Sequence, residues 1–268
     1  MRATLYAIPA SNAVLTAQLA LERKGIEYRR VDQIPVLHRA TMRLRGFEGS
    51  TVPGLKIDGR RVHGSRKIME ILDEVVPEPR LFPEDPARRA AVEEAMAWGE
   101  DVYQRTLRYL LPYSLLRSRD AVGAVLEDSL MFLPTSVAVR TAKPTIFLNA
   151  QLNSSNEVSV RRKLAELPAM FDHVDALIED GVLNGDEPGA ADLMIAPSTR
   201  AFLWWDDIRP VLEDRPAAEH ARRVVPRYPG QIPSVFPPDA VEKLRADGRA
   251  GEDAGLGSAP EGRRHTGG

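Results

Sequence analysis

A proline-rich segment divides this chain into two parts with different structural periods. Residues 77–86 contain four prolines in ten positions, and proline fixes φ and lacks the backbone N–H that helices and central strands use. Before this segment, short runs suited to strands alternate with helical patterns, whereas the long apolar patterns after it have the helical period. The sequence therefore predicts an α/β domain over residues 1–76, a linker over 77–86 and an all-helical domain over 87–228.

The first 76 residues predict a β-α-β unit followed by a hairpin and a further helix. Gly25 can take the left-handed conformation that ends a helix, and Asp58-Gly59 suits a tight hairpin turn. The expected order is a strand over 3–6, a helix over 12–24, a strand over 28–31, a loop with a short helix over 33–49, a hairpin over 52–62 and a helix capped by Ser65.

Helical periodicity dominates the chain beyond the linker. The expected helices span 87–116, 119–133, 157–179, 190–203 and 210–224. Beyond them the chain is first rich in proline and then in Gly, Ala, Arg and Glu without periodicity, so residues 229–268 predict a Pro-rich and disordered tail.

The composition excludes several classes of function. The chain has 36 basic and 38 acidic residues, a balance that points to neither nucleic acid nor an anionic membrane as the main partner. It has no apolar run long enough to span a bilayer and opens without an apolar leader, so we expect a cytoplasmic protein. Because cysteine is absent, disulfides, thiolate metal sites and cysteine nucleophiles are excluded, and the five scattered histidines lack the spacing of metal ligands.

Four short motifs occur in a recognisable order along the chain. They are the turn from Leu5-Tyr6 to Ser11 with the helix after it, Thr51-Val52-Pro53-Gly54-Leu55, His63-Gly64-Ser65-Arg66-Lys67-Ile68, and Ala190-Ala191-Asp192-Leu193-Met194-Ile195-Ala196-Pro197. This order resembles the glutathione transferase superfamily over residues 1 to about 225, although 133–155 and 225–238 fit its pattern poorly. The resemblance implies a thioredoxin-like domain followed by a helical bundle, and the conjugation of a low-molecular-weight thiol to an apolar electrophile.

Ser11 and Asn12 are the candidate catalytic residues. Ser11 lies where a thioredoxin-like chain would carry its reactive cysteine, and a hydroxyl there can donate a hydrogen bond to the thiolate of a bound thiol at a helix N-terminus. Ser11 also suits a plain helix cap. Asn12 departs from the family, which often has proline after the serine, and its amide is an alternative donor, as is the hydroxyl of Tyr6 from the first strand.

Val52, Pro53, Gly64 and Ser65 are the candidate residues for binding the thiol. The resemblance implies a cis bond before Pro53, which would let the backbone of Val52 pair with the cysteinyl unit of the thiol. Ser65 and the free N–H groups of its helix suit a carboxylate. The family has an acid or glutamine where this chain has Gly64, and that side chain helps to hold the ammonium of glutathione.

Gly64 therefore raises the question of which thiol is used. Glutathione has an ammonium at that position, whereas mycothiol has an acetylated cysteine amine and needs no counter-charge. Only six of the 36 basic residues are lysine, which indicates a GC-rich genome and makes an actinobacterial host, where mycothiol occurs, a reasonable expectation.

Tyr103 and Tyr109 lie on the first long helix of the second half, where the resemblance implies that part of the helix faces the electrophile; packing in the core is the other interpretation. Asp192 is interpreted as a structural residue that closes a helix cap with Gly189. No bound cofactor is expected beyond the thiol co-substrate, and a homodimer is included among the partners because the family commonly dimerises. The alternative function is a non-catalytic module that binds a ligand or a protein.

Overall fold

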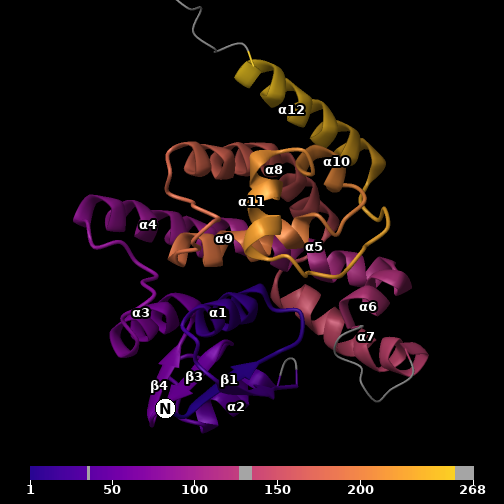
Figure 1. The fold of residues 1–268 in the computed structure, drawn as a ribbon. Coiled ribbons are helices and arrows are strands. Elements are labelled where there is room, and N and C mark those ends of the chain that lie inside the picture. The colour runs from indigo at the N-terminus through magenta and orange to yellow at the C-terminus, as the bar shows by residue number, and fades with distance from the viewer. Residues whose placement is uncertain (35–36, 127–134, 257–268) are drawn as a thin grey trace, which may run out of the picture.

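The computed structural model describes residues 1–34, 37–126 and 135–256. Figure 1 shows the α/β domain at the bottom of the view and the helical domain above it, joined by an extended connection between α3 and α4. The α/β domain contains β1 (Ala3–Ala7), α1 (Asn12–Arg23), β2 (Tyr28–Asp32), α2 (His38–Leu44), β3 (Gly54–Ile57), β4 (Arg60–His63) and α3 (Ser65–Val75).

The sheet has the order β2-β1-β3-β4. β1 is parallel to β2, with Leu5 opposite Arg30, and antiparallel to β3, with Leu5 opposite Leu55. The helix between β1 and β2 makes the parallel crossover possible. This thioredoxin-like arrangement, followed by a helical region, confirms the predicted fold class.

One face of the sheet is covered by α1 and α3, which lie between the sheet and the helical domain in Figure 1. Leu5, Leu55, Leu21 and Leu72 are fully buried in this layer. α1 contacts both α3 and α9. The N-terminus of α1 therefore lies beside the boundary between the domains.

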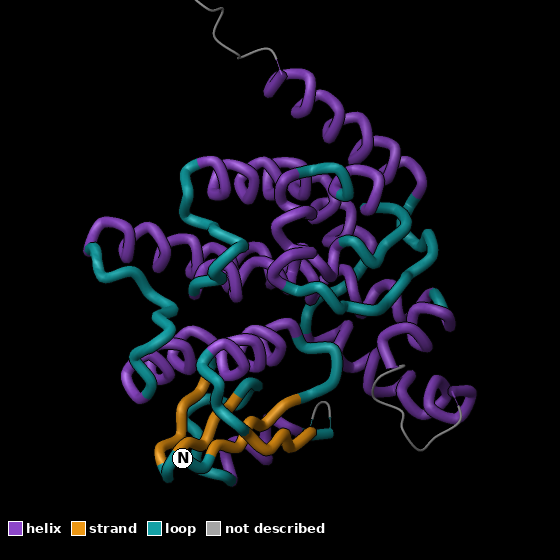
Figure 2. The backbone as a smooth tube through the Cα atoms, viewed as in Figure 1, coloured by secondary structure: helices purple, strands orange, loops and turns teal. Residues whose placement is uncertain are grey.

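The helical domain begins at the end of the linker and continues to the last described residue. Its elements are α4 (Pro86–Trp98), the π-helical turn η1 (Gly99–Tyr103), α5 (Gln104–Arg117), α6 (Arg119–Leu126), α7 (Thr135–Leu152), α8 (Glu157–Glu179), α9 (Ala190–Phe202), α10 (Arg209–Leu212), α11 (Pro216–Val224) and α12 (Pro238–Leu256). Figure 2 shows helices as the main content of this half. No described helix is both long and apolar enough to cross a membrane.

The structure differs from the sequence prediction in two helical segments. The helix expected over 87–116 is interrupted by the π-helical turn, and α7 occupies most of the segment over 133–155, for which no helix was predicted. Over residues 119–126 the helix expected over 119–133 is present as α6, and the rest of that prediction lies outside the described residues.

The prediction of a Pro-rich and disordered tail over 229–268 is wrong over residues 238–256, because these form the helix α12. Val241 and Leu244 are buried, and α12 contacts α8 and α10. Asp239 pairs with Arg161 of α8. Two apolar residues at helical spacing thus anchor a segment whose composition alone suggests disorder. Residues 257–268 of the predicted tail lie outside the described residues.

Asp192 has the structural position that the sequence predicted. It is buried at the start of α9, where Oδ2 accepts a hydrogen bond from the N–H of Gly189 at 2.8 Å. Oδ1 accepts the N–H of Asn184 at 2.8 Å and lies 2.6 Å from Nε2 of His220. These bonds tie the N-terminus of α9 to the preceding loop and to α11.

Candidate functional site

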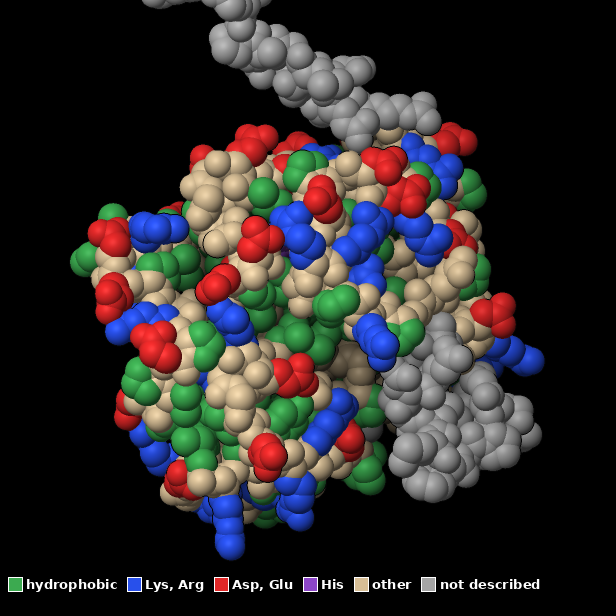
Figure 3. Space-filling view, in the orientation of Figure 1, with side chains coloured by type: hydrophobic (Ala, Val, Ile, Leu, Met, Phe, Trp, Pro, Cys, Tyr) green, Lys and Arg blue, Asp and Glu red, His purple; other side chains and the backbone are tan. Residues whose placement is uncertain are grey.

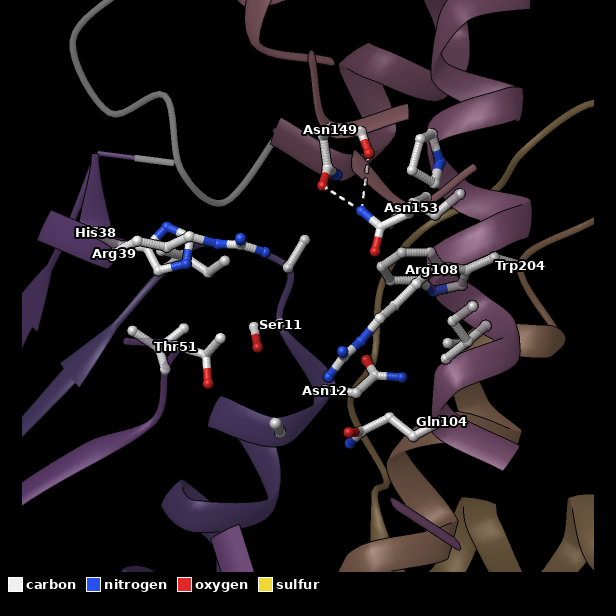
Figure 4. Close-up of a pocket in the computed structure, with 18 of the residues that line it drawn as sticks. Ser11, Asn12, His38, Arg39, Thr51, Gln104, Arg108, Asn149, Asn153 and Trp204 are labelled. Atoms are coloured by element: carbon white, nitrogen blue, oxygen red, sulfur yellow. Dashed lines mark hydrogen bonds between the residues drawn. The ribbon is translucent and has the colours of Figure 1, made fainter. Parts of the chain in front are cut away.

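A cavity of about 210 Å³ lies between the two domains (Figure 4). The α/β domain contributes the loop before α1, the start of α2 and the loop before β3. The helical domain contributes α5, the end of α7 and the segment that follows α9. Asn153, the residue directly after α7, donates to the backbone and side-chain oxygens of Asn149 at 2.8 and 2.7 Å, which gives this part of the wall a fixed polar edge.

Ser11 lies in the cavity wall at the N-terminus of α1. It has the extended backbone of an N-cap residue, and its Oγ accepts a hydrogen bond from the N–H of Val14 at 3.4 Å. Because the hydroxyl acts as acceptor in this cap, its proton stays available to a partner in the cavity. The cap and the donor role that the sequence suggested are therefore compatible in this geometry.

Asn12 is held by a residue from the far end of the chain. The hydroxyl of Tyr228 donates to Asn12 Oδ1, and burial raises the pKa of Tyr228 so that its phenol stays protonated. This bond fixes the amide, and Nδ2 of Asn12 is then buried without a partner among the described residues. An unpaired, buried donor beside a helix N-terminus suits an anionic ligand atom.

Tyr228 is itself held by Trp204, which also lines the cavity. The two rings stack with centroids 4.8 Å apart, and the indole N–H of Trp204 donates to the carbonyl of Tyr228 at 3.3 Å. Tyr228, in the segment after α11, thus contacts two residues of the cavity wall, Asn12 and Trp204, without lining the cavity itself.

Val52 faces the cavity from the loop before β3, and the Val52–Pro53 bond is cis, as predicted. Nε2 of His63 lies 3.0 Å from Thr51 Oγ1 and 3.1 Å from the Thr51 carbonyl. The close approach of this ring also explains Gly49, where a Cβ would lie 2.1 Å from the imidazole. His63, considered from the sequence as a group near the thiol pocket, therefore supports the loop that carries Val52.

Gly64 and Ser65 lie next to this loop but are not among the residues that line the cavity. Gly64 has φ +89° and is the residue before α3, while Ser65 is the first residue of the helix, so the prediction that Ser65 caps it is wrong. The hydroxyl of Ser65 is buried and has no partner among the described residues. Pro53 is also buried, and its carbonyl accepts the N–H of Gly64 at 3.0 Å.

Tyr103 and Tyr109 do not line this cavity, so their predicted placement is wrong. Tyr103 is fully buried in the helical core, where it stacks on Trp98 with centroids 5.0 Å apart and its hydroxyl lies 3.0 Å from that of Thr199. Tyr109 lines a separate open depression with Arg162. Core packing, the other interpretation from the sequence, applies to Tyr103.

The helical wall is instead formed by the next residues of α5. Gln104, Leu107, Arg108 and Leu111 follow each other at helical spacing and all line the cavity. The π-helical turn adds one residue to the helix just before them, which rotates the later side chains by roughly 100°. An uninterrupted helical pattern, which the sequence suggested, cannot reveal this rotation.

The charged groups that the described residues bring to the cavity are basic. Arg39 and Arg108 line it together with His38, and no Asp or Glu within 1–34, 37–126 or 135–256 does so. Burial lowers the pKa of His38, and the charge of Arg39 lowers it further. No local pattern distinguishes these three residues, because Arg39 and Arg108 lie on exposed positions of helices, where arginine is common, and His38 is a lone, half-buried histidine. Over the face shown in Figure 3, by contrast, acidic and basic side chains are intermingled. Among the described residues, no group of three or more metal-ligating side chains occurs.

Comparison with known proteins places these features in context. A family model described as the N-terminal domain of glutathione S-transferase matches residues 5–80. Over 92 residues the chain is 37% identical to maleylacetoacetate isomerase of Mus musculus, a match that covers 33% of this chain and 43% of that protein. The chain thus spans less than half the length of this curated relative.

Solved structures show the same fold over most of the chain. A glutathione S-transferase from Rhodospirillum rubrum F11 has a TM-score of 0.52 at 20% identity and covers 90% of this chain and 99% of its own. Rice GST1 in complex with glutathione has a TM-score of 0.53 at 16% identity, with 94% and 97% covered.

Proposed function

Because this chain belongs to the glutathione transferase superfamily, we propose that it binds a low-molecular-weight thiol between its domains and conjugates it to an electrophile. One observation carries the proposal. Ser11, with its hydroxyl, and Asn12, whose amide nitrogen has no partner among the described residues, both line one cavity at the N-terminus of α1. Two donors and a helix N-terminus favour the anionic form of a bound thiol.

The backbone of Val52 gives the thiol its orientation. The N–H and C=O of Val52 make no backbone hydrogen bond with a described residue, so both can pair with the cysteinyl unit as an added strand. The sulfur would then lie toward Ser11 and Asn12. On ionisation the thiol proton passes to solvent, and the thiolate attacks the electrophile from the α/β side of the cavity.

The identity of the thiol depends on Gly64. This residue has no side chain to balance an ammonium group, so a thiol with an acylated amine, such as mycothiol, is favoured over glutathione in our proposal. Ser65 and the N-terminus of α3 would bind a carboxylate or hydroxyl at that end of the thiol, which requires the buried hydroxyl to become accessible.

Calorimetric titration and the ultraviolet absorbance of the thiolate test the proposal. Glutathione and mycothiol are titrated into the protein and into the variants Ser11→Ala and Asn12→Ala. Loss of one hydrogen bond to a charged sulfur, about 1.5–3 kcal/mol, should raise the pKa of the bound thiol by about one to two units. Ser118→Ala is the matched control, because Ser118 caps α6 through a 3.1 Å bond to the N–H of Ala121 and lies outside the cavity.

Three outcomes are informative. The proposal of a transferase is supported if the bound thiol has a lowered pKa and if Ser11→Ala and Asn12→Ala raise that pKa again. Binding without a change in the pKa of the thiol supports the alternative, a module that binds a ligand or protein without catalysis. Absence of binding for both thiols contradicts the proposal. A cytoplasmic location and a homodimer also belong to the proposal, and light scattering tests the second.

A further inference from the structure

We propose that Arg108, with Arg39 opposite it, binds a carboxylate of the second substrate, which makes the electrophile an organic acid with an apolar body. This inference deepens the proposed function and rests on it for the reaction. It also changes the expectation from the family resemblance, which implied a purely apolar electrophile.

The two guanidinium groups reach the cavity from different domains. Arg108 comes from α5 in the helical domain and Arg39 from α2 in the α/β domain. Figure 4 shows Arg108 reaching toward Asn12 and Arg39 entering the cavity from the other side. Neither guanidinium forms an ion pair with a described residue, in contrast to Arg66, Arg89 and Arg215.

No acidic side chain of the described part of the chain lines the cavity to balance these charges. Burial lowers the pKa of Arg108, and the positive charges of Arg105 and Arg39 lower it further, while Glu100 and Asp101, seven and eight residues earlier in the chain, act in the opposite direction. Arginine still remains protonated at neutral pH. The cavity thus holds two positive charges that a bound anion would compensate, and a guanidinium matches a carboxylate in geometry.

The surroundings of Arg108 in the cavity are mostly apolar. Leu107, Leu111 and Trp204 line the same helical side of the cavity, opposite the loop of Val52 where the thiol is proposed to bind. A ligand on this side meets an apolar wall and one charged group. His38 adds a buried Nδ1 without a partner among the described residues, next to Arg39. An aromatic or aliphatic carboxylic acid satisfies both the apolar and the basic part of this wall.

The test separates the carboxylate of the second substrate from a carboxylate of the thiol. Benzoate and benzamide, which have nearly the same shape and differ in charge, are titrated by calorimetry in the absence of thiol. The proteins are the unmodified chain, Arg108→Gln, Arg39→Gln and the control Arg105→Gln, an exposed arginine of α5 that does not line the cavity. We expect a preference for benzoate of about tenfold, from a hydrogen-bonded ion pair, and its loss in Arg108→Gln and not in Arg105→Gln.

A second arm measures conjugation of glutathione and of mycothiol to chloronitrobenzoate and chloronitrobenzamide. In both reactions the thiolate sulfur bonds to the ring carbon, the C–Cl bond breaks, and chloride leaves with the bonding electrons. Arg108→Gln should lower kcat/KM about tenfold for the acid and leave the amide and the affinity for the thiol unchanged.

Each result decides the inference. Equal affinity for benzoate and benzamide in the unmodified chain overturns it, and so does an Arg108→Gln variant that loses affinity for the thiol as strongly as for benzoate, because the carboxylate would then belong to the thiol. If no thiol binds, the proposed function fails while the benzoate titration still tests the anion site. Should Arg108→Gln fold poorly, Arg108→Met keeps the apolar stem and repeats the comparison.

Discussion

The buried contacts of Lys24 give a quantitative test of how the α/β domain is fastened to the linker. Its side chain is completely buried at the end of α1. Nζ donates to Oδ1 of Asp73 at 2.5 Å and to the carbonyls of Val76 and Pro79 at 2.7 and 2.6 Å. Asp73 in turn accepts the N–H of Leu81 at 2.8 Å. One ammonium group therefore fastens α1 and α3 to the first part of the linker.

The substitution Lys24→Met keeps the length and apolar stem of the side chain and removes the charge. It leaves the carboxylate of Asp73, which is 18% exposed, without its counter-ion, and two buried carbonyls without a donor. Removing one partner of a buried ion pair costs about 3–5 kcal/mol, so we expect the free energy of unfolding to fall by that amount. For a chain of this size the melting temperature should fall by roughly 10 °C.

Urea unfolding followed by circular dichroism measures the loss, and limited proteolysis of residues 77–86 reports on the linker. Lys67→Met is the matched control, because Lys67 pairs with Glu48 at 3.6 Å with both side chains exposed, and such pairs contribute at most about 1 kcal/mol. If Lys24→Met loses no more stability than Lys67→Met and leaves the linker equally resistant to protease, the role assigned to Lys24 is wrong.

Four further predictions follow from named contacts. Asp192→Ala should cost about 2–4 kcal/mol by leaving buried N–H groups unpaired, without a change in thiol affinity; calorimetry showing the reverse would assign it to the site. Tyr228→Phe frees the amide at the start of α1 and should raise the pKa of the bound thiol, as measured by thiolate absorbance, with stability nearly unchanged. Gly64→Ala should destabilise by about 1–3 kcal/mol, because φ +89° with ψ 145° is a region that only glycine adopts readily. Gly64→Glu, compared with Gly64→Ala, should bind glutathione several-fold better; equal glutathione affinity in the two variants would refute the role of Gly64 in thiol choice. Since burial first and Arg39 second lower the pKa of His38, Arg39→Gln should raise that pKa in an NMR titration without restoring its usual value. The folded protein binds this proton less readily than the unfolded chain, so His38 lowers the free energy of unfolding as the pH falls below its usual pKa. This fall in the free energy of unfolding should be smaller in Arg39→Gln.

The sequence determined the α/β domain almost completely. The order of strands and helices, the hairpin turn at Asp58-Gly59 and the break at residues 77–86 all depend on neighbours in the chain, because φ preferences and alternating polarity act over a few residues. Ser11 and Val52, which the family resemblance singled out, both line one cavity and both lie in turns that directly precede regular elements.

Only the tertiary structure decided which residues complete that cavity. Asn12 is oriented by Tyr228, which lies 216 positions away. The face of α5 depends on the π-helical turn, which begins at Gly99, where a Cβ would lie 3.0 Å from Ile195 and Met194 of α9. Tyr103, the last residue of the turn, lies in the core, and the rotated helix after the turn places Arg108 in the cavity wall. The orientation of Asn12 and the rotation of α5 both depend on contacts between distant segments. A local sequence pattern cannot predict which distant side chain will lie beside it.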